Sequence, residues 1–189
     1  MLKEYETWPG CARCEDGRPH TREQGRSCTT IAPTMNYALR PSVREDSEFL
    51  FRLYGTTRPE ISALGWSAEQ QEAFLHMQFN AQQNWYGTTY PDADHQIIEV
   101  EGKAVGRIMI ASSPETNLLV DISLLPEFRH AGIGTALIEA LIEKSRMEGR
   151  RVRLQVLKTN PAQELYRRLG FVQTAEEQMY VHMEKASTG

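Results

Sequence analysis

The sequence predicts an α/β domain built on one central sheet, and two observations carry this prediction. Apolar residues recur at helical spacing between residues 43 and 85, whereas from residue 95 onward they occur in short β-rich runs. These patterns are typical of amphipathic helices and of strands. Along the chain the predicted elements follow the order β-α-α-β-β-β-α-β-α-β-β. A chain of 189 residues, 40% of them hydrophobic, is long enough to bury one such core.

A short strand and two helices are expected first. Residues 37–40 are predicted to form the strand. Ser42 and Ser67 are each followed three residues later by Glu or Gln, which is the capping box that starts a helix. The first helix is expected to end near Gly55 and the second at about Asn84. Their predicted apolar stripes are Phe49, Leu50, Leu53 and Tyr54 in the first helix and Phe74, Met77, Ala81 and Trp85 in the second.

Strands dominate the remainder of the chain, where the hydrophobic period shortens. Glu101 and Gly102 separate two β-rich runs and fit a hairpin turn. Gly149 and Gly170 are expected to end two further helices, because glycine is common just past a helix end. The predicted strands are 95–100, 104–111, 118–125, 152–157, 171–174 and 179–183, and the predicted helices are 132–148 and 160–169.

Residues 1–34 differ in composition from the rest of the chain. They combine charged residues with Thr, Gly and Pro and contain almost no aliphatic side chains. Such a segment cannot bury enough apolar surface to offset the entropy of an ordered chain. We therefore expect a disordered or weakly ordered tail at 1–34 and a domain at 35–189. The alternative is that Met35 is the native start and that the tail is not part of the native protein.

All three cysteines lie in this tail. An odd number of cysteines in a chain expected to be cytosolic argues against a disulfide scaffold. Cys11 and Cys14 have the spacing of a zinc-binding pair, and His20 and Cys28 would complete a set of three thiolates and one imidazole. The segment lacks the hydrophobic residues that cover such a site, and we expect no bound metal.

The composition argues against two kinds of partner. Lys and Arg total 21 against 25 Asp and Glu, which gives a formal net charge of −4. Nucleic-acid backbones are bound by an excess of basic residues, so no nucleic-acid partner is expected. No apolar run approaches the roughly 20 residues that span a bilayer, and the N-terminus has no basic segment followed by an apolar one. We expect a cytoplasmic protein without a membrane partner.

The loop between the strand at 118–125 and the following helix carries the main functional motif. Gly132 and Gly134 allow backbone N–H groups to approach a ligand closely. The start of the helix adds unpaired N–H groups and the positive end of its dipole, and Arg129 adds a charge. This combination suits a pyrophosphate. The third glycine of a dinucleotide-binding fingerprint and the Gly-Lys-Ser/Thr of a Walker loop are both missing.

The motif Arg-x-x-Gly-x-Gly at 129–134 resembles the acyl-CoA pyrophosphate loop of the GNAT superfamily of N-acetyltransferases. A second motif downstream, Leu-Tyr-x-x-Leu-Gly-Phe at 165–171, looks like the closing half of the same fold. The resemblance covers nearly all of residues 36–185. By analogy of fold it implies a mixed, mostly antiparallel central sheet of about 6–7 strands, flanked by about four helices and splayed at the acetyl-CoA site.

The resemblance implies an N-acetyltransferase with acetyl-CoA as cosubstrate, which moves the acetyl group to a primary amine by direct attack. The amides at Leu124 and Leu125 would hold the pantetheine arm and polarise the thioester carbonyl. Asn160 matches a position that often contacts the cofactor, and its alternative role is a plain helix cap. The implied cofactor-binding residues are Leu124, Leu125, Arg129, His130, Ala131, Gly132, Ile133, Gly134, Thr135 and Asn160.

Two catalytic roles follow from this reaction. Tyr166 matches the family's tyrosine that protonates the departing thiolate, and its alternative role is a half-buried aromatic residue of the helix. A base must take a proton from the amine. Asp121, which lies among apolar residues, is the first candidate; alternatively it pairs with a strand edge or an arginine. Glu99 and His95 are further candidates, and for both the alternative is a solvated strand residue.

The resemblance places the acceptor pocket at the first two helices, the loop between them and the last strands. Gln78, Gln82 and Tyr86 are the candidate substrate contacts, and a solvated helix face is the alternative for the two glutamines. The acceptor, a small molecule or a peptide, is left open, and a homodimer is a further expectation. The competing function is a non-catalytic acetyl-CoA-binding sensor or regulatory module. The other side chains expected near the pocket are Tyr54, Arg58, Trp66, Met77, Trp85 and Tyr90.

Overall fold

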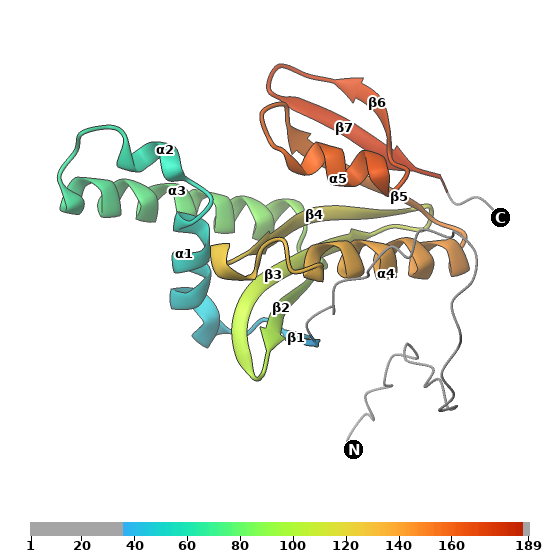
Figure 1. Ribbon diagram of the computed structural model, residues 1–189, viewed down its shortest axis with the longest axis horizontal. Helices are drawn as coiled ribbons and strands as arrows, with labels where there is room; N and C mark the ends of the chain where they lie inside the picture. Colours follow the sequence, from blue (N-terminus) through green and yellow to red (C-terminus); the bar gives the residue numbers. More distant parts are fainter. Residues whose placement is uncertain (1–35, 187–189) are drawn as a thin grey trace, which may run out of the picture. The chain divides into compact units, whose positions relative to one another are not determined.

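The computed structural model describes residues 36–186, which form one seven-stranded sheet with helices around it (Figure 1). The strands lie in the order β1-β2-β3-β4-β5-β7-β6, and only β4 and β5 are parallel neighbours. The predicted α/β class with a mostly antiparallel sheet is therefore confirmed. The strands are β1 (Tyr37–Pro41), β2 (Asp94–Val100), β3 (Lys103–Ser112), β4 (Thr116–Leu124), β5 (Arg151–Leu157), β6 (Val172–Glu176) and β7 (Tyr180–Lys185). The α-helices are α1 (Ser47–Gly55), α2 (Pro59–Ser62), α3 (Ala68–Thr89), α4 (Ile133–Met147) and α5 (Ala162–Arg168).

The first helices differ from the sequence prediction at their ends. The capping box predicted at Ser42 is wrong: the Val43 N–H donates to the Asp46 carboxylate (2.9 Å) at a 3₁₀ turn, and α1 begins after it. The box at Ser67 is present and opens α3. This helix continues to Thr89, beyond its predicted end. Helix α2, which has 4 residues and lies between α1 and α3, was not predicted from the sequence.

Helix α3 turns a different side to the core from the one predicted. Met77 and Trp85 of the predicted stripe are 58% and 52% exposed, whereas Phe79 and Tyr86 are buried. Positions 79, 82 and 86 keep the spacing of one helical face. Because Gln82 lies in the middle of that face, a search for apolar residues alone selects the wrong side.

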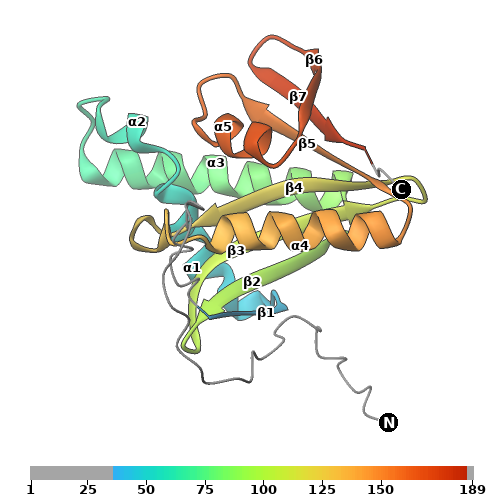
Figure 2. The same cartoon turned by 45° about the vertical axis from the view of Figure 1, so that its right-hand side comes forward.

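Two hydrophobic cores cover the two faces of the sheet. Figures 1 and 2 show α4 on one face and α1 with α3 on the other. In β2, Ile97 packs with α1 and α3, and the next residue, Ile98, packs with the α4 core. Adjacent side chains of a strand point to opposite faces, so this single step separates the two cores.

Strands β4 and β5 are paired at one end and separate toward the other. Thr116–Leu119 pairs with Arg151–Leu154, and Figure 1 shows the two strands diverging beyond this point. Beyond this point the two strands are not paired with each other. We refer to the space between their separated ends, Val120–Leu124 and Gln155–Leu157, as the opening. The predicted splay of the sheet is therefore present at β4 and β5.

A β-bulge lies where the two strands part. Met109 pairs with Asp121 and Ile110 pairs with Leu119, so Val120 is an extra residue in β4. Leu119 packs in the core beneath α4, whereas Asp121 contacts Tyr86 of α3. In a regular strand, residues two positions apart, such as Leu119 and Asp121, point to the same face. The bulge thus turns the Asp121 carboxylate toward α3.

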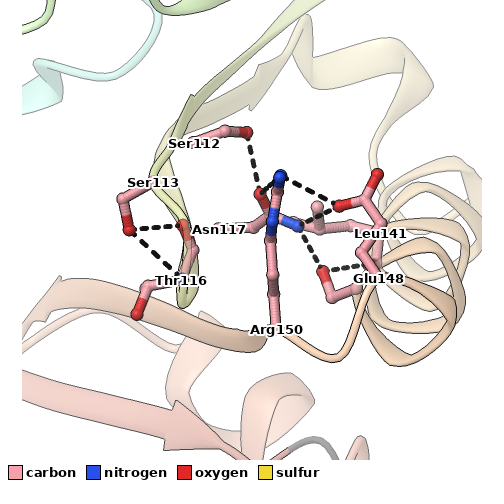
Figure 3. A network of polar contacts seen from close by, with 8 residues as sticks. Ser112, Ser113, Thr116, Asn117, Leu141, Glu148 and Arg150 are labelled. Atoms are coloured by element: carbon pink, nitrogen blue, oxygen red, sulfur yellow. Dashed lines mark hydrogen bonds and ion pairs between the residues drawn. The ribbon is translucent and has the colours of Figure 1, made fainter.

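A buried polar network holds the paired end of β4 to the C-terminal end of α4 (Figure 3). Asn117 is 1% exposed, and its amide group donates to Ser145 (2.8 Å) and Glu148 (3.2 Å). Its amide oxygen accepts from Ser112 (2.7 Å) and Arg150 (3.4 Å). The polar atoms of the Asn117 side chain are thus satisfied, as burial requires. The network fixes this end of the sheet, and the strands separate at the other.

The expectations about the tail, about metal binding and about membrane helices concern different parts of the chain. The tail at 1–34 and its cysteine–histidine set lie outside them. Within residues 36–186, no group of three or more His, Cys, Asp and Glu side chains is arranged to hold a metal ion. In the same part of the chain, no helix has both the length and the apolar composition needed to cross a bilayer.

Candidate active site

The turn from β4 into α4 forms a cradle of unpaired backbone N–H groups at residues 130–135. His130 and Gly132 have φ values of 61° and 82°, the left-handed region that favours glycine. The first helical hydrogen bond runs from Ala136 to the Gly132 carbonyl (3.0 Å). Among the described residues, none of the N–H groups from 130 to 135 donates to an acceptor. A Cβ on Gly134 would meet no atom within 4 Å, so the space beside the cradle is open.

The Arg129 side chain braces the cradle from beside it. Its Nε donates to the Leu124 carbonyl (2.8 Å), and one Nη donates to the carbonyl (3.3 Å) and hydroxyl (2.9 Å) of Thr56. Arg129 therefore ties the end of β4 to the C-terminal end of α1. The guanidinium supplies a fixed charge next to the cradle, and a direct contact between Arg129 and a cofactor stays a prediction.

The two predicted strand-end amides point in different directions. The Leu125 N–H donates to the Val105 carbonyl of β3 (2.9 Å). The prediction of a free amide at Leu125 is therefore wrong. Successive N–H groups of a strand point to opposite edges, so the Leu124 N–H faces the opening. Leu124 remains the candidate for polarising a thioester carbonyl.

A buried polar cluster of four side chains, Arg107, Asp121, Gln82 and Tyr86, lies between the sheet and α3. Arg107 is 3% exposed; its guanidinium forms an ion pair with Asp121 and donates to the Gln82 amide oxygen (3.0 Å). The Tyr86 hydroxyl donates to the same Asp121 oxygen (3.3 Å). The guanidinium carbon lies 5.2 Å from the centre of the Tyr86 ring, a cation–π distance.

The cluster shows the alternative given for Asp121, a pair with an arginine. The carboxylate is not isolated among apolar residues, because it pairs with Arg107. Both of its contacts use Oδ2, and Oδ1 has no partner among the described residues. The side chain is 19% exposed, so this oxygen is available to a substrate. The assignment of Asp121 as the base stays a prediction.

The other two candidate bases have different surroundings. Glu99 accepts from Arg40 (2.7 Å) near the β1 edge of the sheet. His95 is half-buried, and its Nε2 is buried without a partner among the described residues. Burial, and then the charge of Arg107, lowers the pKa of His95, which keeps the imidazole neutral at neutral pH. The interpretation of His95 as a solvated residue is therefore wrong.

Tyr166 lies in the hydrophobic core on the α4 face of the sheet, opposite the polar cluster. It lies on α5, is 7% exposed and packs against Phe171 with ring centres 5.8 Å apart. Burial, and then the negative charge of Asp121, raises the pKa of Tyr166 to about 12. The phenol thus keeps its proton at neutral pH.

The three predicted substrate contacts all lie on the partly buried side of α3. Gln78 accepts from the Tyr54 hydroxyl (3.4 Å), and Gln82 and Tyr86 belong to the polar cluster. The alternative of a fully solvated helix face for the glutamines is therefore wrong. Their contact with a substrate stays a prediction. Three other side chains expected near the pocket are exposed instead, namely Trp66, Met77 and Trp85.

Asn160 lies between β5 and α5. Its Oδ1 accepts from the Ala162 N–H (2.9 Å), which caps the start of the helix. Asn160 therefore has the capping role that was given as its alternative. A contact with the cofactor is compatible with this cap and stays a prediction.

A concavity of about 590 Å³, which the sequence did not predict, lies beside the paired end of β4 and β5. Leu118 and Leu154, close to the point where the strands part, lie at its base. Polar side chains from β5, β6 and β7 form much of its wall, among them Gln155, Thr174 and His182.

Arg107 is the main candidate site residue that the sequence analysis missed. It interrupts the apolar run at 104–111, as Asp121 interrupts the run at 118–125. Either charge alone would be costly to bury. Opposite charges in adjacent strands of a hairpin predict a buried ion pair, and this signal was available in the sequence.

The open sheet and the cradle at the start of α4 define an α/β protein whose strand-to-helix loop is suited to a pyrophosphate group. Residues 91–173 match the acetyltransferase (GNAT) domain family. An uncharacterized N-acetyltransferase of Methanocaldococcus jannaschii is 36% identical over 98 residues, which are 47% of this chain and 43% of the relative. The chain thus matches less than half the length of this curated relative.

Solved structures share the fold across most of the chain. The PaiA N-acetyltransferase of Thermoplasma acidophilum in complex with coenzyme A has a TM-score of 0.62 at 20% identity, over 80% of this chain and 99% of that one. The ribosomal-protein-S18-alanine N-acetyltransferase of Escherichia coli has a TM-score of 0.58 at 17% identity, over 82% and 96%. The chain is thus similar to the GNAT superfamily of N-acetyltransferases, in sequence over residues 91–173 and in fold over most of its length.

Members of this superfamily use acetyl-CoA as the acetyl donor, and the residues present here fit it. The unpaired N–H groups at 130–135 match the oxygens of a pyrophosphate. The open space beside Gly134 leaves room for it. The opening between β4 and β5 leaves strand edges free for the amide groups of the pantetheine arm.

Proposed function

We propose that this protein transfers the acetyl group of acetyl-CoA to a primary amine by direct attack. One arrangement carries the proposal. The cradle at 130–135 follows the unpaired end of β4, Asp121 lies in that end and faces α3, and Tyr166 packs on the opposite face of the sheet. Acyl transfer to an amine needs these parts together: a place for the donor, an acid and a base.

In the proposed reaction the amine nitrogen attacks the carbonyl carbon of the thioester. The Leu124 N–H faces the side on which the carbonyl oxygen becomes negative and donates to it. The carbon–sulfur bond then breaks, and the Tyr166 hydroxyl gives its proton to the departing sulfur. Asp121 takes the proton that the amine loses, through its free Oδ1. Proton exchange with solvent restores both side chains.

The test is a pair of measurements on the full chain. Calorimetry with acetyl-CoA measures binding of the donor, and release of the free thiol in the presence of primary amines measures transfer. We expect binding, and thiol release that depends on the amine. Binding without thiol release for any amine would favour the competing function, a sensor that binds acetyl-CoA without turnover. No binding at all would contradict both.

A further inference from the structure

Arg58, between α1 and α2, places a positive charge on the α3 side of the sheet. Its Nε donates to the Tyr54 hydroxyl (3.2 Å) and its Nη1 to the Thr57 carbonyl (3.3 Å). The guanidinium carbon lies 4.9 Å from the centre of the Tyr54 ring. Within residues 36–186, Arg58 forms no ion pair, and its Nη2 makes no hydrogen bond. The side chain is therefore held in place with one donor group unused.

Polar groups extend from Arg58 along α3 toward the polar cluster. The Tyr54 hydroxyl, which accepts from Arg58, donates to Gln78 (3.4 Å). Gln78 lies one helical turn from Gln82, and Tyr86 lies one turn further along α3. Burial and the Asp121 charge raise the pKa of Tyr86, and the charges of Arg107 and Arg58 oppose this shift.

The charged groups near this row of polar side chains do not cancel. Arg107 and Asp121 neutralise each other as an ion pair, and His95 is neutral because its pKa is lowered. Arg58 is left as a net positive charge. A substrate with several ammonium groups would be repelled there, whereas a carboxylate would gain charge-assisted hydrogen bonds from a fixed guanidinium.

We propose that the acceptor is an amine that also carries a carboxylate, bound with its amine at Asp121 and its carboxylate at Arg58. This inference rests on the acetyltransferase function proposed above. It names the class of substrate as amino-acid-like acceptors. Tyr54 and Thr57 hold the guanidinium, and Nη2 is the donor left for the substrate.

The test compares matched pairs of acceptors, each amino acid beside its amide, with simple diamines added to the panel. For every pair, thiol release gives the ratio of kcat/KM for the acid to kcat/KM for the amide, in the wild type and in Arg58→Gln. The change of this ratio between the two proteins is independent of the intrinsic difference in amine basicity. Arg58→Lys keeps the charge, and Arg52→Gln removes a charge from the exposed side of α1 as a matched control.

We expect the wild type to turn over at least one amino acid, and Arg58→Gln to lower its acid-to-amide ratio about tenfold or more. Arg58→Lys should retain part of the preference, and Arg52→Gln should retain all of it. Acetyl-CoA affinity should be the same in all four proteins. Calorimetry of each variant with acetyl-CoA measures this directly.

Three results would overturn the inference. Preferred turnover of diamines or amides would leave the proposed function intact and remove the substrate class. An unchanged ratio in Arg58→Gln would do the same. Weaker acetyl-CoA binding in Arg58→Gln, with no change in the ratio, would assign Arg58 to a cofactor phosphate. Failure of the proposed function itself gives a different result. In that case no amine, whatever its charge, would cause thiol release from acetyl-CoA, and the inference about the acceptor would fail as well.

Discussion

The two sides of the opening are built in different ways. On the side of α4, the cradle consists of backbone N–H groups from consecutive residues at 130–135. On the side of α3, the polar cluster consists of side chains from β3, β4 and α3. The cradle depends on local chain geometry, whereas the cluster depends on how distant segments pack.

This difference has a physical consequence for each side. A site made of backbone groups tolerates many side-chain changes but not the loss of a glycine that shapes it. A site made of buried charges is part of the packing, so removing one member leaves another charge without its partner. Mutations on the α4 side should therefore affect binding, and mutations on the α3 side should also affect stability.

The largest effect is expected on the α4 side, from Gly132→Glu. The new side chain adds bulk and negative charge against the pyrophosphate, and we expect acetyl-CoA affinity to fall about 1,000-fold or more, which is about 4.1 kcal/mol. Calorimetry with acetyl-CoA measures the loss. Gly149→Glu is the matched control, because its φ of 68° is also left-handed and it lies at the other end of α4. Equal affinity in the two variants would show that the cradle does not bind the cofactor.

The next largest effect is expected on the α3 side, from Arg107→Met. Asp121 loses its cation, and we expect the free energy of unfolding to fall by about 3 kcal/mol, because the carboxylate remains largely buried. Urea denaturation followed by fluorescence measures it. Arg146→Met, which breaks an exposed pair with Glu143, should leave stability unchanged.

A second substitution tests the origin of this effect. Arg107→Met combined with Asp121→Leu removes both charges and should recover part of the lost stability. A double variant that is less stable than Arg107→Met by the full cost of the second change would mean that the two side chains act independently.

The same contrast explains what the sequence predicted and what it did not. The cradle was predictable because Gly132 and its neighbours form one contiguous motif. The burial of Tyr86 was not predicted, because it depends on how α3 packs on the sheet. The charges at Arg107 and Asp121 indicated an ion pair, but which side chains meet depends on the register of β3 and β4 and on the bulge at Val120. The loss of the free amide at Leu125 has the same cause, since its acceptor lies on β3. Local signals determine the elements, and pairing between strands determines the side-chain cluster.

A smaller effect is expected for Tyr166→Phe, which acts at the boundary between the two sides. Removing the acid should lower kcat about 100-fold, at the lower end for general acid catalysis, and leave acetyl-CoA affinity unchanged. Because the pKa of Tyr166 is raised to about 12, the wild-type kcat should show no loss from deprotonation of this group between pH 6 and 9. Tyr180→Phe, at a 44% exposed site on β7, should behave as the wild type. An unchanged kcat in Tyr166→Phe would remove it from the acid role.

The smallest effect is expected for His95→Gln, and it should appear only at acidic pH. Burial and the Arg107 charge lower the pKa of His95 below its usual 6.5 in the folded protein. The unfolded chain therefore binds a proton at a higher pH than the folded protein does, and stability falls as the pH drops below about 6.5.

The glutamine variant has no such proton to bind, so its free energy of unfolding should fall less between pH 7 and 5 than that of the wild type. Urea denaturation at the two pH values makes the comparison. Asp46, whose pKa is lowered below 3.8 mainly by its hydrogen bond from Arg40, affects stability only at more acidic pH. Equal falls in the two proteins would mean that His95 is as accessible to protons in the folded chain as in the unfolded one.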